Sequence, residues 1–329
     1  MPHEELRRTS IRRFDFMLCR MFSMCQASLC TVAVFLVVDA PGAADETALP
    51  INVPYRKLGY LRNPQIDESS GLACSRRVPD LFWTHNDSGD EPRLFAFDRQ
   101  GNDRGEFVME GAEAHDWEDM ASFMLDGRPC LLIADVGDNQ SRAAGYTLYL
   151  VEEPELTTNP TTNRRLDLLQ TVHFRYSDGP HDCEAMAFDP TDRRAFLVAK
   201  TTRKNSNIYM FEWPSTTNSS DTPAVAEQIA TVDYPRVTGM DTSPNGRRIV
   251  LVTYGLAFEL FRAQDETWSQ AFARTGRPLI MPFRRQGESI CYGPDGRKLY
   301  LTSEKRPTPF FETESQALDS ISRTLRDSP

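Results

Sequence analysis

The stretch HDWEDMA at residues 115–121 returns 66 residues later as HDCEAMA at residues 181–187. Three further stretches share its pattern of a polar residue, a spacer, a second polar or acidic residue, a small residue and an apolar pair: ESSGLACS (68–75), RVTGMDTSP (236–244) and QGESICYGP (286–294). The second polar position is occupied in chain order by Ser70, Glu118, Glu184, Thr238 and Glu288, at intervals of 48, 66, 54 and 50 residues. Recurrence near 50 residues indicates that one structural unit is repeated along the chain.

Short runs rich in β-branched and aromatic residues follow each copy, which is typical of β-strands. The first run after each motif covers 80–87, 130–137, 195–202, 249–256 and 299–305. A further run covers 94–98, 146–154, 208–214 and 258–263, and a last one covers 105–110, 171–178 and 228–235. The turn sequences DPTDRR, SPNGRR and GPDGRK precede three of these runs and predict hairpins. Each repeat is therefore expected to hold four strands.

Repeats of four short strands predict an all-β fold, a β-propeller of five blades of four antiparallel strands. Six blades are the alternative, because a degenerate blade would fit in the 66-residue interval. The stretch TTNPTTNRR (157–165) in that interval reads better as a loop insertion. The last repeat lacks an outer strand, whereas YRKLGYL (55–61) precedes the first repeat without a blade of its own. We expect this N-terminal strand to complete the last blade and close the ring.

The first 43 residues have the layout of a secretory signal peptide. Five arginines lie between residues 7 and 20, the apolar run SLCTVAVFLVV covers 28–38, and the small residues DAPGAA cover 39–44. The apolar run is too short to span a bilayer comfortably, so we expect no stable membrane span after cleavage. The sequence predicts a secreted or periplasmic protein with one propeller domain over 50–312. Residues 313–329 are expected to form a polar tail.

Charge and cysteine content narrow the classes of ligand. The chain has 329 residues and a formal net charge of -10 at pH 7, which argues against nucleic acid as a partner. We expect a monomer with a small-molecule or cation ligand. Four cysteines lie beyond residue 43, and no two of them form a CxxC pair that would favour zinc: Cys74, Cys130, Cys183 and Cys291. Buried single thiols and one disulfide are both compatible with their spacing.

Several of these motifs resemble those of a known group of proteins. The stretches ESSGLA (68–73), LFAFDRQGN (94–102), DCEAMA (182–187) and GESICYGPDGRKLYLTSE (287–304) resemble extracytoplasmic bacterial propellers. The nearest groups are the SdiA-regulated and the esterase-like-phytase types, and the resemblance covers most of residues 55–305. It implies a propeller fold. Because these groups include enzymes, cation-binding proteins and proteins of no known activity, the resemblance implies no single reaction.

The propeller geometry predicts where polar side chains converge. The starts of the innermost strands and the turns after the second strands are expected to meet at one face and to form a funnel. Its predicted ligand-binding carboxylates are Glu68, Glu118, Glu184, Glu288 and Glu304. Its candidate catalytic residues are His85, His115, His181, Lys200 and Tyr254. Crowded carboxylates recruit a cation, pair with a basic residue or hold a proton. The alternative is that the glutamates and histidines bond neighbouring blades and are structural.

A second duplication lies in the same funnel. The pattern D-x-G-D occurs as DSGD (87–90) and DVGD (135–138) at matching places in the first two repeats. Carboxylate and amide oxygens from separate loops suit Ca²⁺. The predicted metal ligands are Asp87, Asp90, Asp135, Asp138 and Asn139. The alternative is that these residues are turn formers that bond their own backbone.

These features predict a cation-dependent hydrolase of esters, lactones or phosphoesters. A Ca²⁺ ion would polarise the substrate, a histidine would serve as base, and Lys200 would stabilise negative charge. No G-x-S-x-G nucleophile motif is present. A non-catalytic ligand- or protein-binding propeller is the alternative. A glycoside-active propeller, with Trp83, Trp117 and Tyr254 as sugar platforms, is the second alternative.

Overall fold

The structure, a computed structural model, describes residues 49–156, 164–201, 204–215 and 222–315. The chain divides into two units, Met1–Glu46 and Thr47–Pro329, and all described residues belong to the second unit. The predicted signal peptide (1–43) and most of the predicted tail lie outside the described residues. The described part is almost entirely β-structure.

Antiparallel pairings join the strands into consecutive sets of four, each of which we refer to as a blade. Blade one contains β3 (Ser69–Cys74), β4 (Leu81–Asn86), β5 (Arg93–Asp98) and β6 (Asp103–Glu110). Blade two contains β7 (Trp117–Leu125), β8 (Arg128–Asp135), β9 (Tyr146–Glu152) and β10 (Arg164–Tyr176). Blade three contains β11 (Cys183–Asp189), β12 (Arg194–Ala199), β13 (Ser206–Glu212) and β14 (Ala224–Val232).

The remaining two sets include strands from the beginning of the described chain. Blade four contains β15 (Val237–Thr242), β16 (Arg248–Thr253), β17 (Leu256–Phe261) and β18 (Arg277–Ile280), with β1 (Ile51–Asn52) added in parallel to β18. Blade five contains β19 (Ile290–Tyr292), β20 (Lys298–Leu301), β21 (Pro309–Glu314) and β2 (Tyr55–Tyr60).

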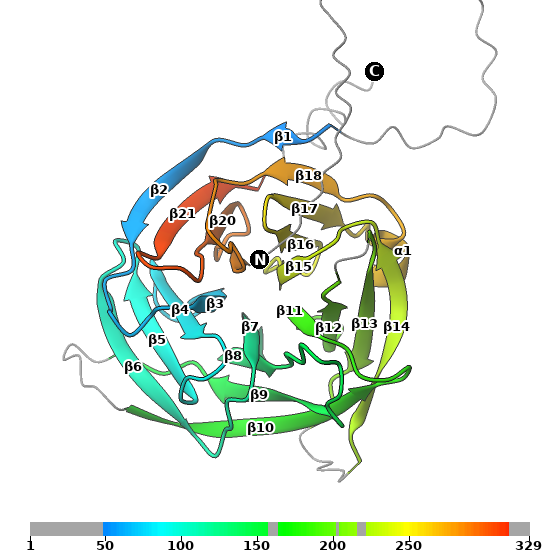
Figure 1. The fold of residues 1–329 in the computed structure, drawn as a ribbon, viewed down its shortest axis with the longest axis horizontal. Coiled ribbons are helices and arrows are strands. Elements are labelled where there is room, and N and C mark those ends of the chain that lie inside the picture. The colour runs from blue at the N-terminus through cyan, green and yellow to red at the C-terminus, as the bar shows by residue number, and fades with distance from the viewer. Residues whose placement is uncertain (1–48, 157–163, 202–203, 216–221, 316–329) are drawn as a thin grey trace, which may run out of the picture. The chain divides into compact units, whose positions relative to one another are not determined.

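The blades are arranged around a common centre (Figure 1). The first strand of each blade is the innermost, and it contacts the first strand of the next blade in the order β3, β7, β11, β15, β19 and back to β3. This closed circle of contacts is the architecture of a β-propeller. The predicted all-β propeller fold is therefore confirmed.

The ring is closed by the N-terminal strand, as predicted. Strand β2 pairs in antiparallel with β21, with Lys57 opposite Phe311, and so supplies the outer strand that the last repeat lacks. Strand β1 extends the same segment onto β18 of the neighbouring blade. Because one segment binds two blades, the sheet edges at the closure are covered.

The outer strand of blade two is longer than predicted. Strand β10 pairs in parallel with β6 at one end and with β14 at the other, so it ties three blades together on the outside of the ring. Arg164 and Arg165, assigned to a loop from the sequence, form the start of this strand and lie opposite Phe107 and Val108. Polar composition alone predicted a loop there because pairing with a distant strand leaves no local signal.

Two features at the ends of blades also differ from the prediction. Strand β21 continues to Glu314, into the segment predicted as a tail, and the Ser315 hydroxyl donates to Glu259 over 2.6 Å. A short helix, α1 (Trp268–Phe272), precedes β18 and begins at Thr267, which caps it together with Gln270. Five residues are too few to produce a helical period in the sequence.

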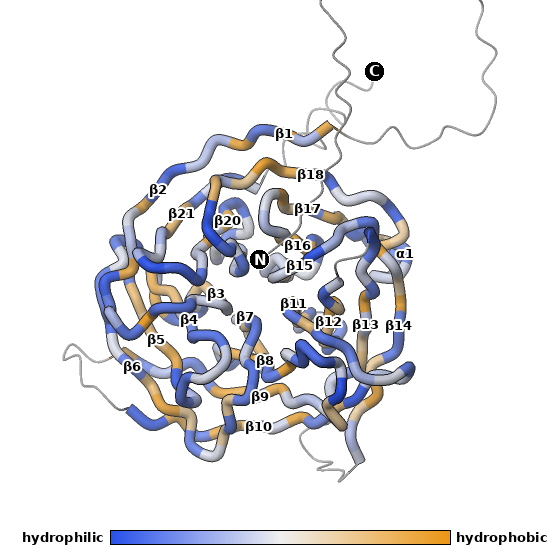
Figure 2. The backbone as a smooth tube through the Cα atoms, viewed as in Figure 1, coloured by the Kyte–Doolittle hydropathy of each residue, from blue (hydrophilic) through white to orange (hydrophobic). Residues whose placement is uncertain are grey.

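Apolar side chains fill the space between neighbouring blades. Figure 2 shows hydrophobic residues concentrated in the strands and hydrophilic residues in the connecting loops. Phe123 of blade two stacks on Phe188 of blade three with ring centroids 4.2 Å apart.

Two glycines allow the predicted hairpin turns to form. The backbone φ values of Gly246 and Gly296 are 63° and 67°, and residues that carry a Cβ rarely adopt such positive values.

The cysteines of the described chain contribute to this packing. Buried single thiols were one of the two predicted possibilities, and the four cysteines beyond residue 43 are all free and buried: Cys74, Cys130, Cys183 and Cys291. Burial raises the pKa of the Cys183 thiol to about 12, so it stays neutral and unreactive at neutral pH.

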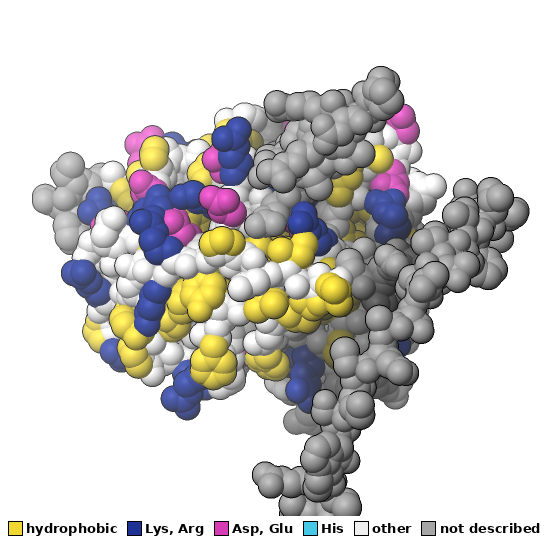
Figure 3. All heavy atoms as spheres, turned by 90° about the horizontal axis from the view of Figure 1, so that it is seen from above, with side chains coloured by type: hydrophobic (Ala, Val, Ile, Leu, Met, Phe, Trp, Pro, Cys, Tyr) yellow, Lys and Arg dark blue, Asp and Glu magenta, His cyan; other side chains and the backbone are white. Residues whose placement is uncertain are grey.

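Outside the ring, large hydrophobic side chains remain exposed on one side. Tyr55 of β2 is 53% exposed, Ile280 of β18 is 40% exposed, and Phe283 beyond β18 is 89% exposed. Figure 3, which views this side, shows hydrophobic side chains gathered in a band with basic side chains around it. No helix in the described part of the chain has the length and hydrophobicity needed to cross a membrane.

A buried carboxylate links the inner strands of three blades. Asp119 lies in β7 and is fully buried. Its Oδ2 accepts hydrogen bonds from the backbone N–H groups of Met186 in β11 and Met240 in β15, each over 2.9 Å, and its Oδ1 accepts from Met120 over 2.8 Å. Asp241 of β15 likewise accepts from the N–H of Tyr292 in β19 over 2.7 Å. These carboxylates hold together strands that belong to different blades.

We expect the substitution Asp119→Ala to destabilise the ring. It leaves three buried N–H donors unpaired, at a cost of about 1–3 kcal/mol for each, so the free energy of unfolding should fall by at least about 3 kcal/mol. Urea unfolding followed by circular dichroism measures this change. Asp167→Ala, on the exposed outer strand β10, is the control and should stay within about 0.5 kcal/mol of wild type. Equal stability of the two variants would contradict the bridging role of Asp119.

Candidate functional site

Strand pairing brings the predicted polar residues to one end of the ring. The starts of the inner strands lie opposite the ends of the second strands, as in the pairs Ser69–Asn86, Trp117–Asp135 and Cys183–Ala199. Residues just before an inner strand and just after a second strand therefore share one end, which we call the acidic mouth. It contains Glu68, Asp87, Asp116, Glu118, Glu184, Lys200, Tyr254, Glu288, Glu304 and Lys305.

Three carboxylates of the acidic mouth form a compact group. Asp87 follows β4 of blade one, whereas Asp116 and Glu118 stand at the start of β7 in blade two. One carboxylate oxygen from each lies within 4.8 Å of the others. Gly137 makes this grouping possible, because a Cβ at that position would come within 2.4 Å of both Asp116 and Glu118. The glycine of the DVGD motif thus leaves room for carboxylates from another part of the chain.

Burial and repulsion between neighbouring carboxylates raise the pKa of each of these three acids. Burial raises the pKa of Asp87 to about 6, with added repulsion from Glu304 and Asp116. Burial, then the charges of Glu184 and Asp87, raise the pKa of Glu118 well above its usual range. Burial raises the pKa of Asp116 as well, with repulsion from other aspartates. A cation bound among these oxygens would remove the repulsion.

Glu184 and Lys200 form an ion pair next to this group. The Lys200 ammonium donates to Glu184 Oε1, whereas Glu184 Oε2 is buried without a hydrogen-bond partner within the described residues. Burial raises the pKa of Glu184 to about 7 although Lys200 pulls it down. Burial disfavours the charged form of Lys200, but the bond to Glu184 and its charge outweigh this and raise the Lys200 pKa. The unpartnered oxygen is a site for a ligand or for a proton.

A second group of side chains surrounds Glu288 on the other side of the mouth. Tyr254 donates its hydroxyl to Glu288 Oε1 over 3.1 Å. Gln286 donates its amide to Glu304 Oε2 over 2.6 Å. Burial, together with a hydrogen bond and charge from Glu304, raises the pKa of Glu288 to about 10. Glu288 therefore carries a proton at neutral pH.

The remaining predicted glutamate lies at the rim. Glu68 is partly exposed, and its carboxylate accepts from the Lys305 ammonium over 2.8 Å. Lys305 also lies 3.6 Å from Glu304, so its charge is shared between two acids. Four of the five predicted ligand-binding glutamates are buried, and Glu68 is the exception among them.

The histidines of the two HDxExMA motifs do not join the carboxylates. His115 is exposed, and its Nδ1 lies 3.1 Å from Asp135 Oδ2, a contact that raises the His115 pKa. His181 lies with its Nε2 2.9 Å from Asp178 and 2.8 Å from the Tyr209 hydroxyl of β13. Both histidines thus contact their own blade or its loops.

His85 is the third predicted catalytic histidine, and it is fully buried. Its Nδ1 lies 2.8 Å from the carbonyl oxygen of Asn86, while its Nε2 is unpartnered in the described structure. Burial lowers the pKa of His85 to about 4, so the ring is neutral at physiological pH. Trp117 packs edge-on against it with ring centroids 5.4 Å apart.

All four carboxylates of the D-x-G-D motifs have partners within the chain, and that of Asp87 accepts from the N–H of Ser88 over 2.6 Å. Asp90 accepts from Arg93 over 2.7 Å and from Asn86 over 2.7 Å. Asp135 accepts from the N–H of Asp116 over 2.8 Å.

The second DVGD aspartate closes its own loop in the same way. Asp138 Oδ2 accepts from the N–H groups of Arg142 and Ala143 over 2.6 and 2.7 Å, and Asn139 is exposed. The structure therefore groups Asp87 with Asp116 and Glu118, whereas the carboxylates of Asp90, Asp135 and Asp138 accept hydrogen bonds from other donors of the chain.

Two members of the site were absent from the predicted ligand set. Asp116 is the Asp of the first HDxExMA copy, and Asp182 is its counterpart in the second copy, where it accepts from the N–H of Asp138 over 3.0 Å. The duplicated His-Asp is the sequence signal that could have identified these two aspartates.

Comparisons with known proteins give only distant structural likenesses. No protein-family model matches the sequence, and neither does any curated protein. A gluconolactonase of Xanthomonas campestris is similar in structure with a TM-score of 0.44 and 10% sequence identity, over 83% of this chain and 93% of that one. A chain of a mitotic checkpoint complex gives a TM-score of 0.37 and 13% identity, over 74% of this chain and 61% of that one. These likenesses carry no argument about activity, and the propeller fold rests on the strand pairings.

The raised pKa values predict how the stability of the metal-free protein depends on pH. Glu184 and Glu288 keep a proton in the folded state at pH values where the unfolded chain has released it. Each such group lowers the free energy of unfolding by about 1.4 kcal/mol per pH unit between its unfolded and folded pKa. In the presence of EDTA we therefore expect stability to fall from roughly pH 5 to pH 8, measured by urea unfolding.

The variant Glu288→Gln tests this dependence, because it keeps the acceptor for Tyr254 and removes the titration. Its stability should fall less steeply with pH than that of the wild type. Glu227→Gln, an exposed residue of β14, should behave like the wild type. Parallel pH profiles for wild type and Glu288→Gln would contradict the assignment.

Proposed function

We propose that the acidic mouth binds a divalent cation, Ca²⁺, through Asp87, Asp116 and Glu118. The observation that carries this proposal is the approach of three carboxylate oxygens from two blades to within 4.8 Å of one another. Hard oxygen ligands suit Ca²⁺, whereas Zn²⁺ favours nitrogen or sulfur, and these three residues offer neither. The unpartnered Glu184 Oε2 agrees with a ligand at this place.

The protein is further proposed to be exported, as residues 1–43 predict. Extracellular calcium modules bind with dissociation constants of about 10⁻⁴–10⁻³ M. A site of three carboxylates at the acidic mouth would bind Ca²⁺ with a dissociation constant in that range. Export would expose it to calcium outside the cytoplasm.

The proposed reaction is the hydrolysis of an ester or a lactone. A bound divalent cation polarises a carbonyl oxygen and so makes the carbonyl carbon more reactive toward water. Glu184 would accept the proton of that water at its free Oε2, and Lys200 holds the carboxylate in place through Oε1. The fit is better for a neutral substrate than for a phosphoester, because Lys200 and Lys305 are paired with glutamates.

Sugar chemistry has less support. Trp83 and Trp117, considered as sugar platforms, are buried, with 0% and 2% of their surface exposed. Their indole N–H groups donate to Glu153 and to the carbonyl of Glu113, each at hydrogen-bond distance. Tyr254 alone of the three is accessible at the mouth, and its hydroxyl is bonded to Glu288.

A non-catalytic binding propeller is the second candidate. The pairs Tyr254–Glu288 and Lys305–Glu68 favour it, because they join blade four to blade five and blade five to blade one without any ligand. In that case the cation would be structural, and it would raise stability without promoting any reaction.

We expect Ca²⁺ to raise the melting temperature of the EDTA-treated full chain. Binding to the folded state alone adds about 2.7 kcal/mol at a hundredfold excess over the dissociation constant, which corresponds to roughly 5 °C or more for a domain of this size. Differential scanning calorimetry measures the shift. The variant Asp116→Asn, which weakens the three-carboxylate group, should lose most of it.

The control distinguishes the two carboxylate groupings. Asp138→Asn changes a carboxylate that bonds Arg142, Ala143 and Tyr146 and lies outside the three-carboxylate group, so it should keep the calcium response. A response lost in Asp138→Asn and kept in Asp116→Asn would favour the D-x-G-D set instead. No response in the wild type would refute the calcium site.

Turnover separates the hydrolase from the binding propeller. With Ca²⁺ present we expect hydrolysis of phenyl acetate or δ-valerolactone, and Glu184→Gln should reduce the rate by about a hundredfold because the proton acceptor is removed. Glu227→Gln serves as the control with an unchanged rate. If Ca²⁺ stabilises the protein and neither substrate is hydrolysed, the binding function is favoured.

A further inference from the structure

A cavity of about 610 Å³ lies at the end of the ring opposite the acidic mouth. Its lining residues follow the last residues of the inner strands, such as Ser75 and Arg76 after β3 and Ser243 and Pro244 after β15. The mouth residues stand at the first residues of those strands. Because the inner strands run side by side around the centre, the two sites occupy opposite ends.

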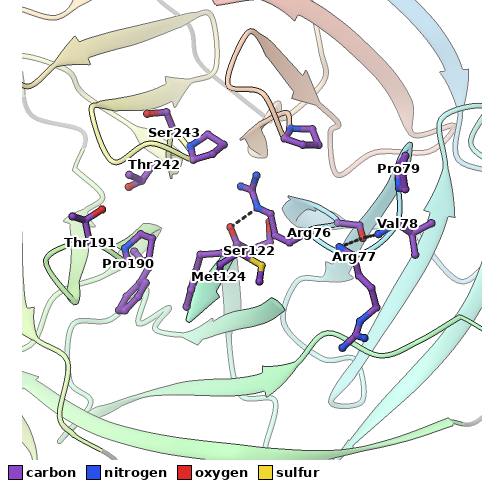
Figure 4. A pocket seen from close by; sticks show the side chains of 15 residues that line it. Arg76, Arg77, Val78, Pro79, Ser122, Met124, Pro190, Thr191, Thr242 and Ser243 are labelled. Carbon is purple, nitrogen blue, oxygen red and sulfur yellow. Dashed lines mark hydrogen bonds between the residues drawn. The ribbon is translucent and has the colours of Figure 1, made fainter. Parts of the chain in front are cut away.

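The cavity contains one basic group with free hydrogen-bond donors. Arg76 Nε donates to the carbonyl oxygen of Ser122 over 3.0 Å, and Figure 4 shows the guanidinium projecting among the lining residues. Within the described residues its two terminal nitrogens have no hydrogen-bond or ion-pair partner. Arg77 differs, since its guanidinium is bonded to Glu152, Glu155 and the carbonyl of Glu153. Arg76 alone of this pair is available to a ligand.

Nearby carboxylates do not hydrogen-bond the Arg76 guanidinium, although its charge opposes the rise that burial causes in the pKa of Asp241. Glu153 accepts from the N–H of Arg76 over 2.8 Å and from the indole of Trp83 over 3.0 Å. Asp241 accepts from the N–H groups of Thr242 and Tyr292, over 2.8 and 2.7 Å. Both acids are therefore held by other donors, and the positive charge of Arg76 faces the cavity.

A second polar group in the cavity wall also lacks a partner. Thr242 is 4% exposed, and its Oγ1 makes no hydrogen bond within the described structure. A buried hydroxyl without a partner is uncommon, because it loses its bonds to water on burial. Its presence in the wall of the same cavity is independent evidence for a polar ligand atom there.

The rest of the wall is mainly apolar. It is formed by Val78, Phe123, Met124, Phe188, Pro190, Pro244 and Pro294. A ligand that fills the cavity therefore needs an apolar body as well as a polar end.

We infer that this cavity binds a small organic carboxylate, with its carboxylate on the free edge of the Arg76 guanidinium and its hydrocarbon part against the apolar wall. The planar fork of an arginine matches the two oxygens of a carboxylate. A phosphate group carries more charge and would call for further basic groups, whereas Arg76 is the single unpaired one. This site is separate from the proposed calcium site and does not depend on it.

Calorimetric titration of the full chain with hexanoate tests the inference. Hexanoate is expected to bind to the wild type, and hexan-1-ol, which has the same hydrocarbon chain without the charge, should bind about tenfold more weakly or worse. Arg76→Met should reduce the affinity for hexanoate by about tenfold or more. Arg128→Met, which removes an exposed charge at the hairpin between β7 and β8 near the same end, should retain it.

A second variant guards against misfolding of Arg76→Met. Met124 is 47% exposed, so Met124→Trp should fold and should fill the cavity while Arg76 is kept. It too should lose hexanoate binding, with a melting temperature close to that of the wild type. The inference is overturned if hexanoate fails to bind the folded wild type, or if it binds Arg76→Met or Met124→Trp with unchanged affinity. The calcium response of all these variants should be unaltered, which separates this test from that of the proposed function.

Discussion

The carboxylate of Asp119 is the interaction on which the centre of this structure depends. A propeller joins its blades mainly through side chains, because the inner strands of neighbouring blades do not share a hydrogen-bond ladder. The Asp119 side chain in β7 bridges that gap, because its carboxylate accepts hydrogen bonds from backbone N–H groups of β11 and β15. Burial of a carboxylate is costly, and the three N–H donors offset that cost only when all three strands are in place. The same bonds therefore fix the relative positions of the strands whose first residues form the acidic mouth.

The two ends of the ring have opposite chemistry, and both follow from the repeat. Each inner strand begins beside polar or acidic residues, so one end collects carboxylates. Three inner strands are followed by hairpin turns that contain Pro190, Pro244 and Pro294. The prolines that mark those turns in the sequence become the apolar wall of the cavity. One repeated unit thus produces an acidic site at one end and an apolar pocket around Arg76 at the other.

Within the acidic mouth, burial decides which groups are available for chemistry. Glu288 holds a proton because it shares a buried place with Glu304. Glu184 forms an ion pair with Lys200 through Oε1, and its Oε2 has no hydrogen-bond partner within the described residues. His115 and His181 lie outside this set because their rings bond to aspartates of their own blades. The chemistry proposed for the mouth consequently rests on carboxylates rather than on the histidines that make the motif conspicuous.

The sequence by itself determined the repeat, the strands and the end of the ring at which the polar residues gather. The period near 50 residues, the hairpin turns and the additional strand at 55–61 are local or periodic signals. They can be recognised in the sequence without knowing which residues are in contact. Only the tertiary structure decided that Asp116 joins Asp87 and Glu118, that Arg164 and Arg165 belong to a strand, and that Arg76 is free. Asp119 and Asp241 interrupt columns of small residues in the repeat, yet no local pattern reveals which distant N–H groups they bind. Partners of this kind are set by the closure of the ring, which brings together residues that are far apart in the chain.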